Sequence, residues 1–144
     1  MSLRLLYAKE GVAVPDNRDL YDIGLKGSKA YLERARELIK KFINAIINDE
    51  RGFFSLGKSE LEELKLTHQQ LKTKVNKHHK PIIKYFGTGI GINLMYTESL
   101  IAEDVMLFFL KQGVIVLPIH DSFIVRSGYQ SSLEAQMKIS FNVF

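Results

Sequence analysis

The 144-residue sequence lacks several features that would define a function class at once. It has no cysteine, which excludes disulfides, thiolate metal sites and cysteine nucleophiles. No apolar run is long enough to span a bilayer, and Glu10 interrupts any signal-peptide core near the amino terminus. We therefore expect no membrane partner and a cytoplasmic location.

Linkers are scarce as well, since the three prolines are scattered and no Gly/Ser-rich or repeated segment divides the chain. The composition, 46% hydrophobic and 25% charged residues, is typical of an ordinary globular protein rather than a disordered or fibrous one. At this length there is room for one hydrophobic core. The sequence thus predicts a single domain over residues 1–144.

Acidic residues are missing from one stretch, residues 65–84, which holds six lysines and three histidines. The whole chain has a net charge of only +4, so the positive charge is concentrated here. A solvated helix face is one interpretation; a surface for phosphates of DNA or RNA is the other. The candidate nucleic-acid contacts are Lys72, Lys74, Lys77, Lys80 and Lys84.

Apolar residues recur at helical spacing over residues 30–48, which predicts the clearest amphipathic helix of the chain. Two short helices should begin at Ser59 and Thr67, because each is followed three residues later by Glu or Gln, as in a capping box. The second should end near His79, since Pro81 disfavours helical geometry in the residue before it.

Further elements follow along the chain. Residues 3–9 are expected to form a short helix or the end of a strand, and residues 97–112 a helix ended by Gly113, with Phe108 on its apolar face. Two β-branched segments should pair as a hairpin, and a last helix should start at about Ser131. The predicted fold class is α+β, mostly helical.

The predicted hairpin carries His120 and Asp121 between the strand residues 114–119 and 122–126. A carboxylate at the junction of two hydrophobic strands should project from the hairpin tip, where it could bind a hard cation such as Mg²⁺. An ordinary turn-forming Asp is the alternative. His120, Asp121 and Ser122 cannot form a hydrolase triad, because consecutive strand residues point to opposite faces.

The long helix carries a polar stripe opposite its apolar face, made of Arg36, Lys40, Asn44 and Asn48 at intervals of four residues. Such a stripe is either a solvent face or a rail for a triphosphate or a nucleic-acid backbone.

Residues 52–59, GFFSLGKS, satisfy the phosphate-loop pattern formally. A helix rather than a strand is predicted before them, and two phenylalanines would occupy the loop, so Lys58 and Ser59 are better explained as a helix start. A small nucleotide-binding protein using Lys58, Ser59 and Asp121 remains an alternative function. Adjacent His78 and His79 suit no zinc site.

The order of these features resembles the right-hand single-subunit polymerases: the family A DNA polymerases and the related phage RNA polymerases. A helix with Arg36 and Lys40, then a helix ending at Gly113, then LPIHDSFIV and a last helix, is similar to a fingers helix followed by the palm. LRLLYAKEG and RDLYDIG are similar to the segment after the first catalytic strand.

The resemblance implies roles for the candidate residues. Asp121 would be one of two carboxylates that hold catalytic Mg²⁺, with His120 beside it; Arg36, Lys40 and Asn44 would face a nucleoside triphosphate. The second family Asp would precede residues 3–7, and the sequence does not contain it. We therefore expect a polymerase-like protein of phage or mobile-element type that binds DNA or RNA, is inactive alone, and would need a companion polymerase chain. A non-catalytic helical interaction module is the remaining alternative.

Overall fold

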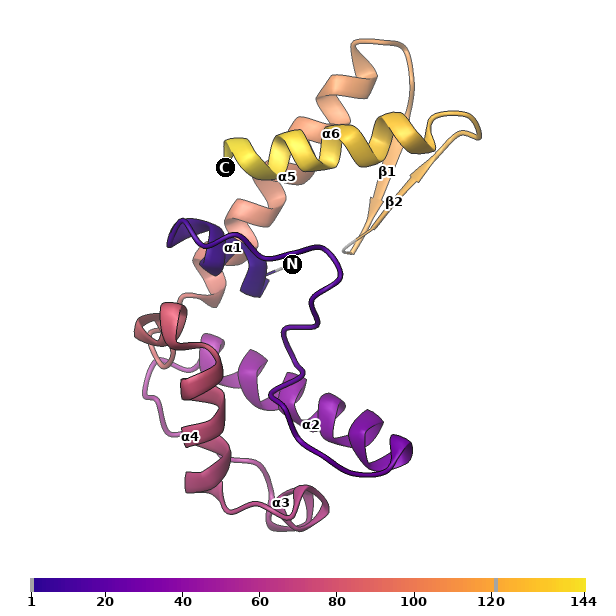
Figure 1. The fold of residues 1–144 in the computed structure, drawn as a ribbon. Helices are drawn as coiled ribbons and strands as arrows, with labels where there is room; N and C mark the ends of the chain where they lie inside the picture. Colours follow the sequence, from indigo (N-terminus) through magenta and orange to yellow (C-terminus); the bar gives the residue numbers. More distant parts are fainter. Residues whose placement is uncertain (1, 121) are drawn as a thin grey trace. The chain divides into compact units, whose positions relative to one another are not determined.

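The structure, a computed structural model, describes residues 2–120 and 122–144. It is α+β and mostly helical, with one small antiparallel sheet among the described residues (Figure 1). Its elements are α1 (Ser2–Lys9), α2 (Lys29–Asn48), α3 (Lys58–Leu64), α4 (His68–His78), the 3-10 helix η1 (Lys80–Tyr85), α5 (Gly91–Leu110), β1 (Val116–Ile119), β2 (Ser122–Val125) and α6 (Gln130–Val143).

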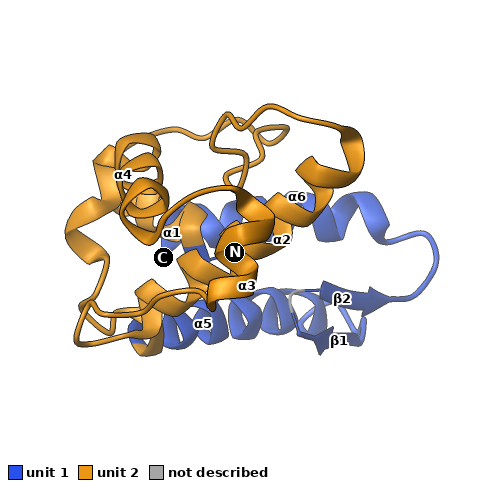
Figure 2. Ribbon diagram, turned by 90° about the horizontal axis from the view of Figure 1, so that it is seen from below, with its two compact units in different colours: residues 1–2, 93–144 blue, residues 3–92 orange. Residues whose placement is uncertain are grey.

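The chain divides into two compact units, shown in two colours in Figure 2. The first unit holds residues 1–2 and 93–144, and the second holds residues 3–92. The expectation of one domain over residues 1–144 stays a prediction. In the described part of the chain, no helix is both long enough and apolar enough to cross a membrane.

The second unit is built on α2, whose predicted amphipathic pattern is confirmed. Its buried face includes Leu38, Phe42 and Ile43, each at most 2% exposed. Ser28 caps the helix by accepting a hydrogen bond from the backbone N–H of Tyr31. The helix therefore presents one face to the core of its unit and leaves the polar stripe exposed.

The predicted capping box of α4 is confirmed. The Thr67 hydroxyl accepts from the Gln70 N–H at 3.2 Å, and the Gln70 side chain accepts from the Thr67 N–H at 2.9 Å. The helix ends at His78, as Pro81 predicts, but the chain continues directly into η1 with that proline in its first turn. A proline tolerated at a helix start thus ends one helix and opens the next.

A helix begins at Lys58, as expected for Lys58 and Ser59, but the predicted capping box of Ser59 with Glu62 is wrong, because Gly57 is the N-cap. The carboxylate that satisfies the first turn belongs to Glu60, which accepts from the Gly57 N–H at 2.9 Å. Glu60 also pairs with Lys41 of α2 at 2.6 Å. Glu60 thus serves both the cap and an ion pair with α2, and the N-cap lies two residues before the predicted one.

The α5 helix begins at Gly91, six residues before the start predicted from sequence. Thr97, expected near the helix start, donates its hydroxyl to the Asn93 carbonyl at 3.0 Å, as a threonine inside a helix does. At the other end Gly113 has a φ of +71° and follows the helix as predicted. Phe109 is fully buried, whereas Phe108, expected on the buried face, is 40% exposed.

The hairpin is present where the sequence predicts it. Val116 pairs with Val125, Leu117 with Ile124, Pro118 with Phe123 and Ile119 with Ser122. His120 has a φ of +50°, the left-handed geometry that tight hairpin loops need at their first position. The hairpin thus sets His120 at its tip, where it is exposed.

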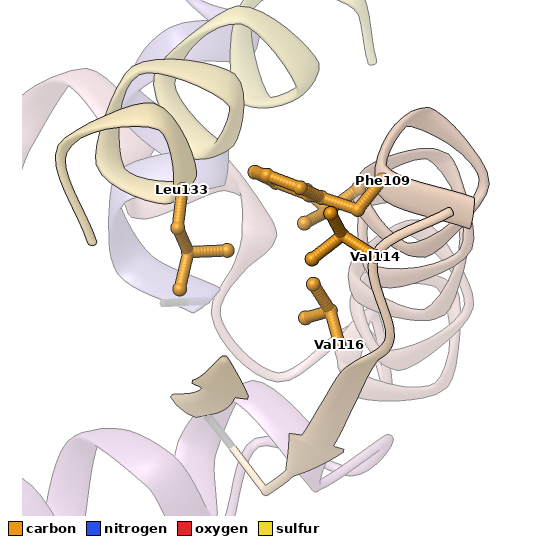
Figure 3. Packing of buried hydrophobic residues seen from close by; sticks show 5 residues of the cluster. Phe109, Val114, Val116 and Leu133 are labelled. Atoms are coloured by element: carbon orange, nitrogen blue, oxygen red, sulfur yellow. The ribbon is translucent and has the colours of Figure 1, made fainter. Parts of the chain in front are cut away.

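One face of the hairpin packs in the core of the first unit. Val116 joins Val105, Phe109, Val114 and Leu133 in a buried cluster, with Leu133 coming from α6 (Figure 3). A polar contact also joins α5 and α6. The Ser140 hydroxyl of α6 donates to the Asp104 carboxylate of α5 at 2.6 Å and accepts from the Gln136 side chain at 3.1 Å. Leu117 and Ile124 lie on the other face of the hairpin, and each is 53% exposed.

Candidate nucleic-acid interface

The lysine surface consists of Lys72, Lys74 and Lys77 on α4 and Lys80 at the start of η1. All four side chains are exposed. Within residues 2–120 and 122–144, no carboxylate lies in salt-bridge contact with any of them. The run without acids therefore stays a surface of uncompensated positive charge after folding, which is what a polyanion requires.

Lys84, the fifth candidate, differs from the other four. Its ammonium group lies 2.8 Å from Glu10 Oε1, which also accepts a hydrogen bond from the Tyr85 hydroxyl. The hydrogen bond from Lys84, with that from Tyr85, holds the pKa of Glu10 below its ordinary value. Lys84 is thus neutralised by an acid far away in sequence and adds less to the lysine surface than its position in the run suggests.

An aromatic pocket of about 200 Å³ opens beside the lysine surface. Its lining is apolar apart from two side chains of α4, and consists of Phe42, Ile46, Gly52, Phe54, Lys72, Asn76, Ile83, Phe86 and Gly87. Phe42 and Phe54 pack with ring centroids 6.2 Å apart. Sequence reasoning missed this pocket, because its three phenylalanines come from α2, from the segment after it and from the residue after η1.

Two glycines form part of the pocket wall. The Gly87 N–H donates to the Ile46 carbonyl at 2.7 Å, and a Cβ on Gly87 would lie 2.8 Å from the Gly52 Cα. Both glycines have positive φ, +69° at Gly52 and +72° at Gly87. The close approach requires the absence of a side chain at Gly87, whereas a Cβ on Gly52 would lie 3.9 Å from the Gly87 Cα, an ordinary contact.

The polar stripe of α2 is exposed, as predicted, but its cations are not free. The Arg36 guanidinium binds Asp19 through two contacts, Nε to Oδ2 at 2.5 Å and a terminal nitrogen to Oδ1 at 3.3 Å. Arg36 and Lys40 both lie over the Tyr21 ring, 5.5 Å and 5.9 Å from its centroid. Asn44 is exposed on the same stripe.

The contact with Asp19 shifts the pKa of both partners. Partial burial works to raise the Asp19 pKa, but the hydrogen bonds from Arg36 and from the Tyr21 N–H outweigh it, so the pKa falls below its ordinary value. The same hydrogen bond raises the pKa of Arg36. Both groups are charged at neutral pH, and the carboxylate occupies the face of Arg36 that a phosphate would take.

The hollow beside this pair measures about 420 Å³. Apolar residues such as Ile23, Leu32 and Ile39 line it, together with the cations Lys29 and Arg36 and the acids Asp19, Asp22 and Glu33. The three carboxylates outnumber the two cations, so the lining has a net negative charge that disfavours a polyanion. The hollow is therefore a poorer phosphate site than the lysine surface.

The phosphate-loop pattern of residues 52–59 folds without a preceding strand, since α2 lies directly before it. The Glu60 carboxylate already accepts the Gly57 N–H, at the point where a phosphate would have to bind. Phe53 is 86% exposed. These features favour a capped helix start over a phosphate-binding loop.

Of the two candidate catalytic residues, His120 lies exposed at the hairpin tip, and Asp121 lies outside the described residues. Among the described residues no three histidine or acidic side chains gather as a metal site would require.

The comparisons with protein-family models, with curated proteins and with solved structures found no match for the chain.

Proposed function

We propose that the protein binds nucleic acid through the lysine surface and is a polymerase-like protein of phage or mobile-element type, corresponding to part of a palm and fingers. The observation that supports nucleic-acid binding is the persistence of four exposed lysines with no acidic partner among the described residues. The order of α2, α5, the hairpin and α6 agrees with the order that the polymerase resemblance requires.

The charge on this surface gives binding a measurable signature. Each phosphate that a lysine neutralises releases condensed counterions. The logarithm of the association constant for a duplex therefore falls linearly with the logarithm of the salt concentration, with a slope of roughly −0.9 per phosphate contact. With four contacts, affinity would fall roughly 10²-fold between 50 mM and 200 mM salt.

The test compares two triple variants by duplex titration at several salt concentrations. Lys74→Gln, Lys77→Gln and Lys80→Gln together should lower the magnitude of the salt slope by about 3. The matched control changes three exposed lysines elsewhere, Lys9, Lys26 and Lys111, to Gln. If the salt dependence falls by the same amount in both variants, binding depends on the overall charge of the protein and not on a defined surface, and the proposal is wrong.

The polymerase part of the proposal needs a test of its own at Asp121. By the resemblance this residue would hold Mg²⁺, with the second carboxylate supplied by a companion chain. Binding of Mg²⁺ or Mn²⁺ should be measured with a primer–template present, in the unmodified protein and in Asp121→Ala. Loss of metal binding in the variant supports a polymerase-type site; equal or absent binding in both leaves a nucleic-acid-binding protein without one.

A further inference from the structure

We propose that the aromatic pocket receives one unpaired base of a single-stranded nucleic acid whose phosphates lie on the lysine surface. This inference rests on the proposed nucleic-acid binding and adds the class of nucleic acid. It is independent of the polymerase resemblance, since it uses neither Asp121 nor the polar stripe.

One lysine of α4, Lys72, lies at the aromatic pocket. Lys72 lines the pocket, is exposed, and has no acidic partner among the described residues, so a cation for a phosphate stands at the pocket opening. Asn76, one helical turn further along α4, lies on the same face and also lines the pocket. A cation for a phosphate and an amide with both donors and an acceptor therefore stand at one opening.

The lining of the pocket offers aromatic side chains to a base. Phe54 and Phe86 are half-buried, so parts of both side chains remain accessible beside the fully buried Phe42. Bases bind aromatic side chains through their π faces, whatever their sequence, and single-strand binding proteins combine such side chains with a basic groove. The Asn76 amide can hydrogen-bond a base edge, which duplex pairing would otherwise occupy.

The aromatic pocket and the hollow beside Arg36 differ in the charged side chains that line them. Among the described residues, no acidic side chain lines the aromatic pocket, whereas Asp19, Asp22 and Glu33 line the larger hollow beside Arg36. The two cavities thus differ in the charge that an incoming phosphate would meet. Charge complementarity assigns the nucleic-acid strand to the aromatic pocket, although it is the smaller of the two.

The volume of the aromatic pocket limits what can enter it. A cavity of about 200 Å³ offers room for a single small ring system and none for a stack of base pairs. A base in a duplex is stacked and paired, and must leave the helix before it can enter such a pocket. The geometry therefore favours a single strand over a duplex of the same length and charge.

The experiment measures binding of an oligothymidylate and of a duplex of equal length, at one salt concentration, to the unmodified protein and to Phe54→Leu. Leucine keeps the side chain apolar but removes the π face. We expect the affinity for the single strand to fall roughly tenfold and the affinity for the duplex to stay unchanged. The control is Phe123→Leu, which alters another half-buried phenylalanine, in the hairpin.

A second measurement needs no variant. A single 2-aminopurine placed in the oligothymidylate should become shielded from acrylamide quenching when the unmodified protein binds, and the same base in the duplex should not. A probe that stays open to quencher in the bound single strand would overturn the inference.

The outcomes separate this inference from the proposed function. If Phe54→Leu loses the same affinity for the single strand and the duplex, or loses none for either, base capture is overturned. The proposed function still stands in that case if binding of both nucleic acids depends on Lys74, Lys77 and Lys80. An unmodified protein that binds neither nucleic acid would overturn both.

Discussion

The Tyr7 hydroxyl lies 2.8 Å from Nδ1 of His79, 72 positions further along the chain, and the two rings meet edge to face with centroids 5.9 Å apart. His79 has no exposed surface and Tyr7 only 1%. Burial, followed by the neighbouring charge of His78, lowers the His79 pKa from 6.5 to about 4, against an opposing effect of the Leu20 backbone. The imidazole is therefore neutral in the folded protein at neutral pH.

This buried histidine predicts a loss of stability on acidification. Unfolded His79 takes up a proton near its ordinary pKa of 6.5, whereas folded His79 does so only near 4. Its contribution is thus complete above pH 6.5, falls as the pH drops toward 4 and is lost below that. A shift of this size corresponds to about 3 kcal/mol, and urea unfolding between pH 7 and pH 4.5 measures it.

The His79 contribution is separated from that of the carboxylates by two variants. His79→Gln should unfold with a shallower dependence on pH, because it has no group to protonate. Tyr7→Phe removes the hydroxyl but keeps His79 buried, so it should keep the full dependence even if it is less stable overall. Identical pH dependences in the unmodified protein and His79→Gln would exclude this origin.

The pairing of Asp19 with Arg36 predicts a gain of function on removal of the acid. If the stripe of α2 binds a nucleoside triphosphate, as the polymerase resemblance implies, Asp19 competes with the phosphates for the same guanidinium. Asp19→Asn should raise triphosphate affinity roughly two- to fivefold, the scale of an exposed ion pair. Calorimetric titration tests this, with Glu37→Gln as the control, since this acid of α2 pairs with Arg34 and does not line the hollow. Lower affinity in Asp19→Asn would mean that the acid positions the stripe instead.

The contact between Gly87 and Gly52 predicts an unusually costly glycine substitution. In Gly87→Ala the new Cβ would meet backbone 2.8 Å away, and the residue would keep a φ of +72°. Gly24→Ala is a matched control, because its φ is +80° and nothing lies within 4 Å of the added carbon. Thermal unfolding should show a loss of about 1 kcal/mol in Gly24→Ala and about 1–2 kcal/mol more in Gly87→Ala. Similar losses in the two variants would show that only the backbone conformation matters.

Ser140 predicts a polar weak point in the first unit. Ser140→Ala removes the donor to Asp104 and leaves the Gln136 side chain, itself 7% exposed, without its acceptor. A buried polar group that loses its partner costs about 1–3 kcal/mol. Denaturant unfolding should detect this loss, whereas Ser132→Ala, at an exposed position of the same helix, should change stability by about 0.5 kcal/mol or less. An unchanged midpoint for Ser140→Ala would show that water replaces the hydroxyl.

Local patterns predicted those parts of the fold that depend on local chemistry. The amphipathic period of α2, the Thr67 cap and Gly113 after α5 are decided within a few residues, and the structure confirms them. The capping-box pattern predicts Ser59 as the cap of α3, but Gly57 and Glu60 have the same three-residue spacing, and the structure uses that pair. A local pattern does not choose between two such caps in one segment, and the contact of Glu60 with Lys41 comes only from the tertiary fold.

The candidate interface shows the same limit. Exposure of the lysine surface follows from the sequence, because charged residues in an amphipathic helix face solvent. The neutralisation of Lys84 by Glu10 and of Arg36 by Asp19 does not, since each acid approaches only through the tertiary fold. The aromatic pocket was unforeseen for the same reason, as Phe42, Phe54 and Phe86 share no sequence period.

The pairing of Pro118 with Phe123 has a consequence for how the hairpin can associate. Ile119 and Ser122 form the last, hydrogen-bonded pair of the ladder, so the next pair directs its backbone groups outward. At Pro118 that outward position carries no N–H, which interrupts the row of donors along the free edge of β1. An added strand therefore finds a weaker partner in β1 than in β2. Stacking into an open-ended fibril needs two receptive edges, and this proline weakens one of them.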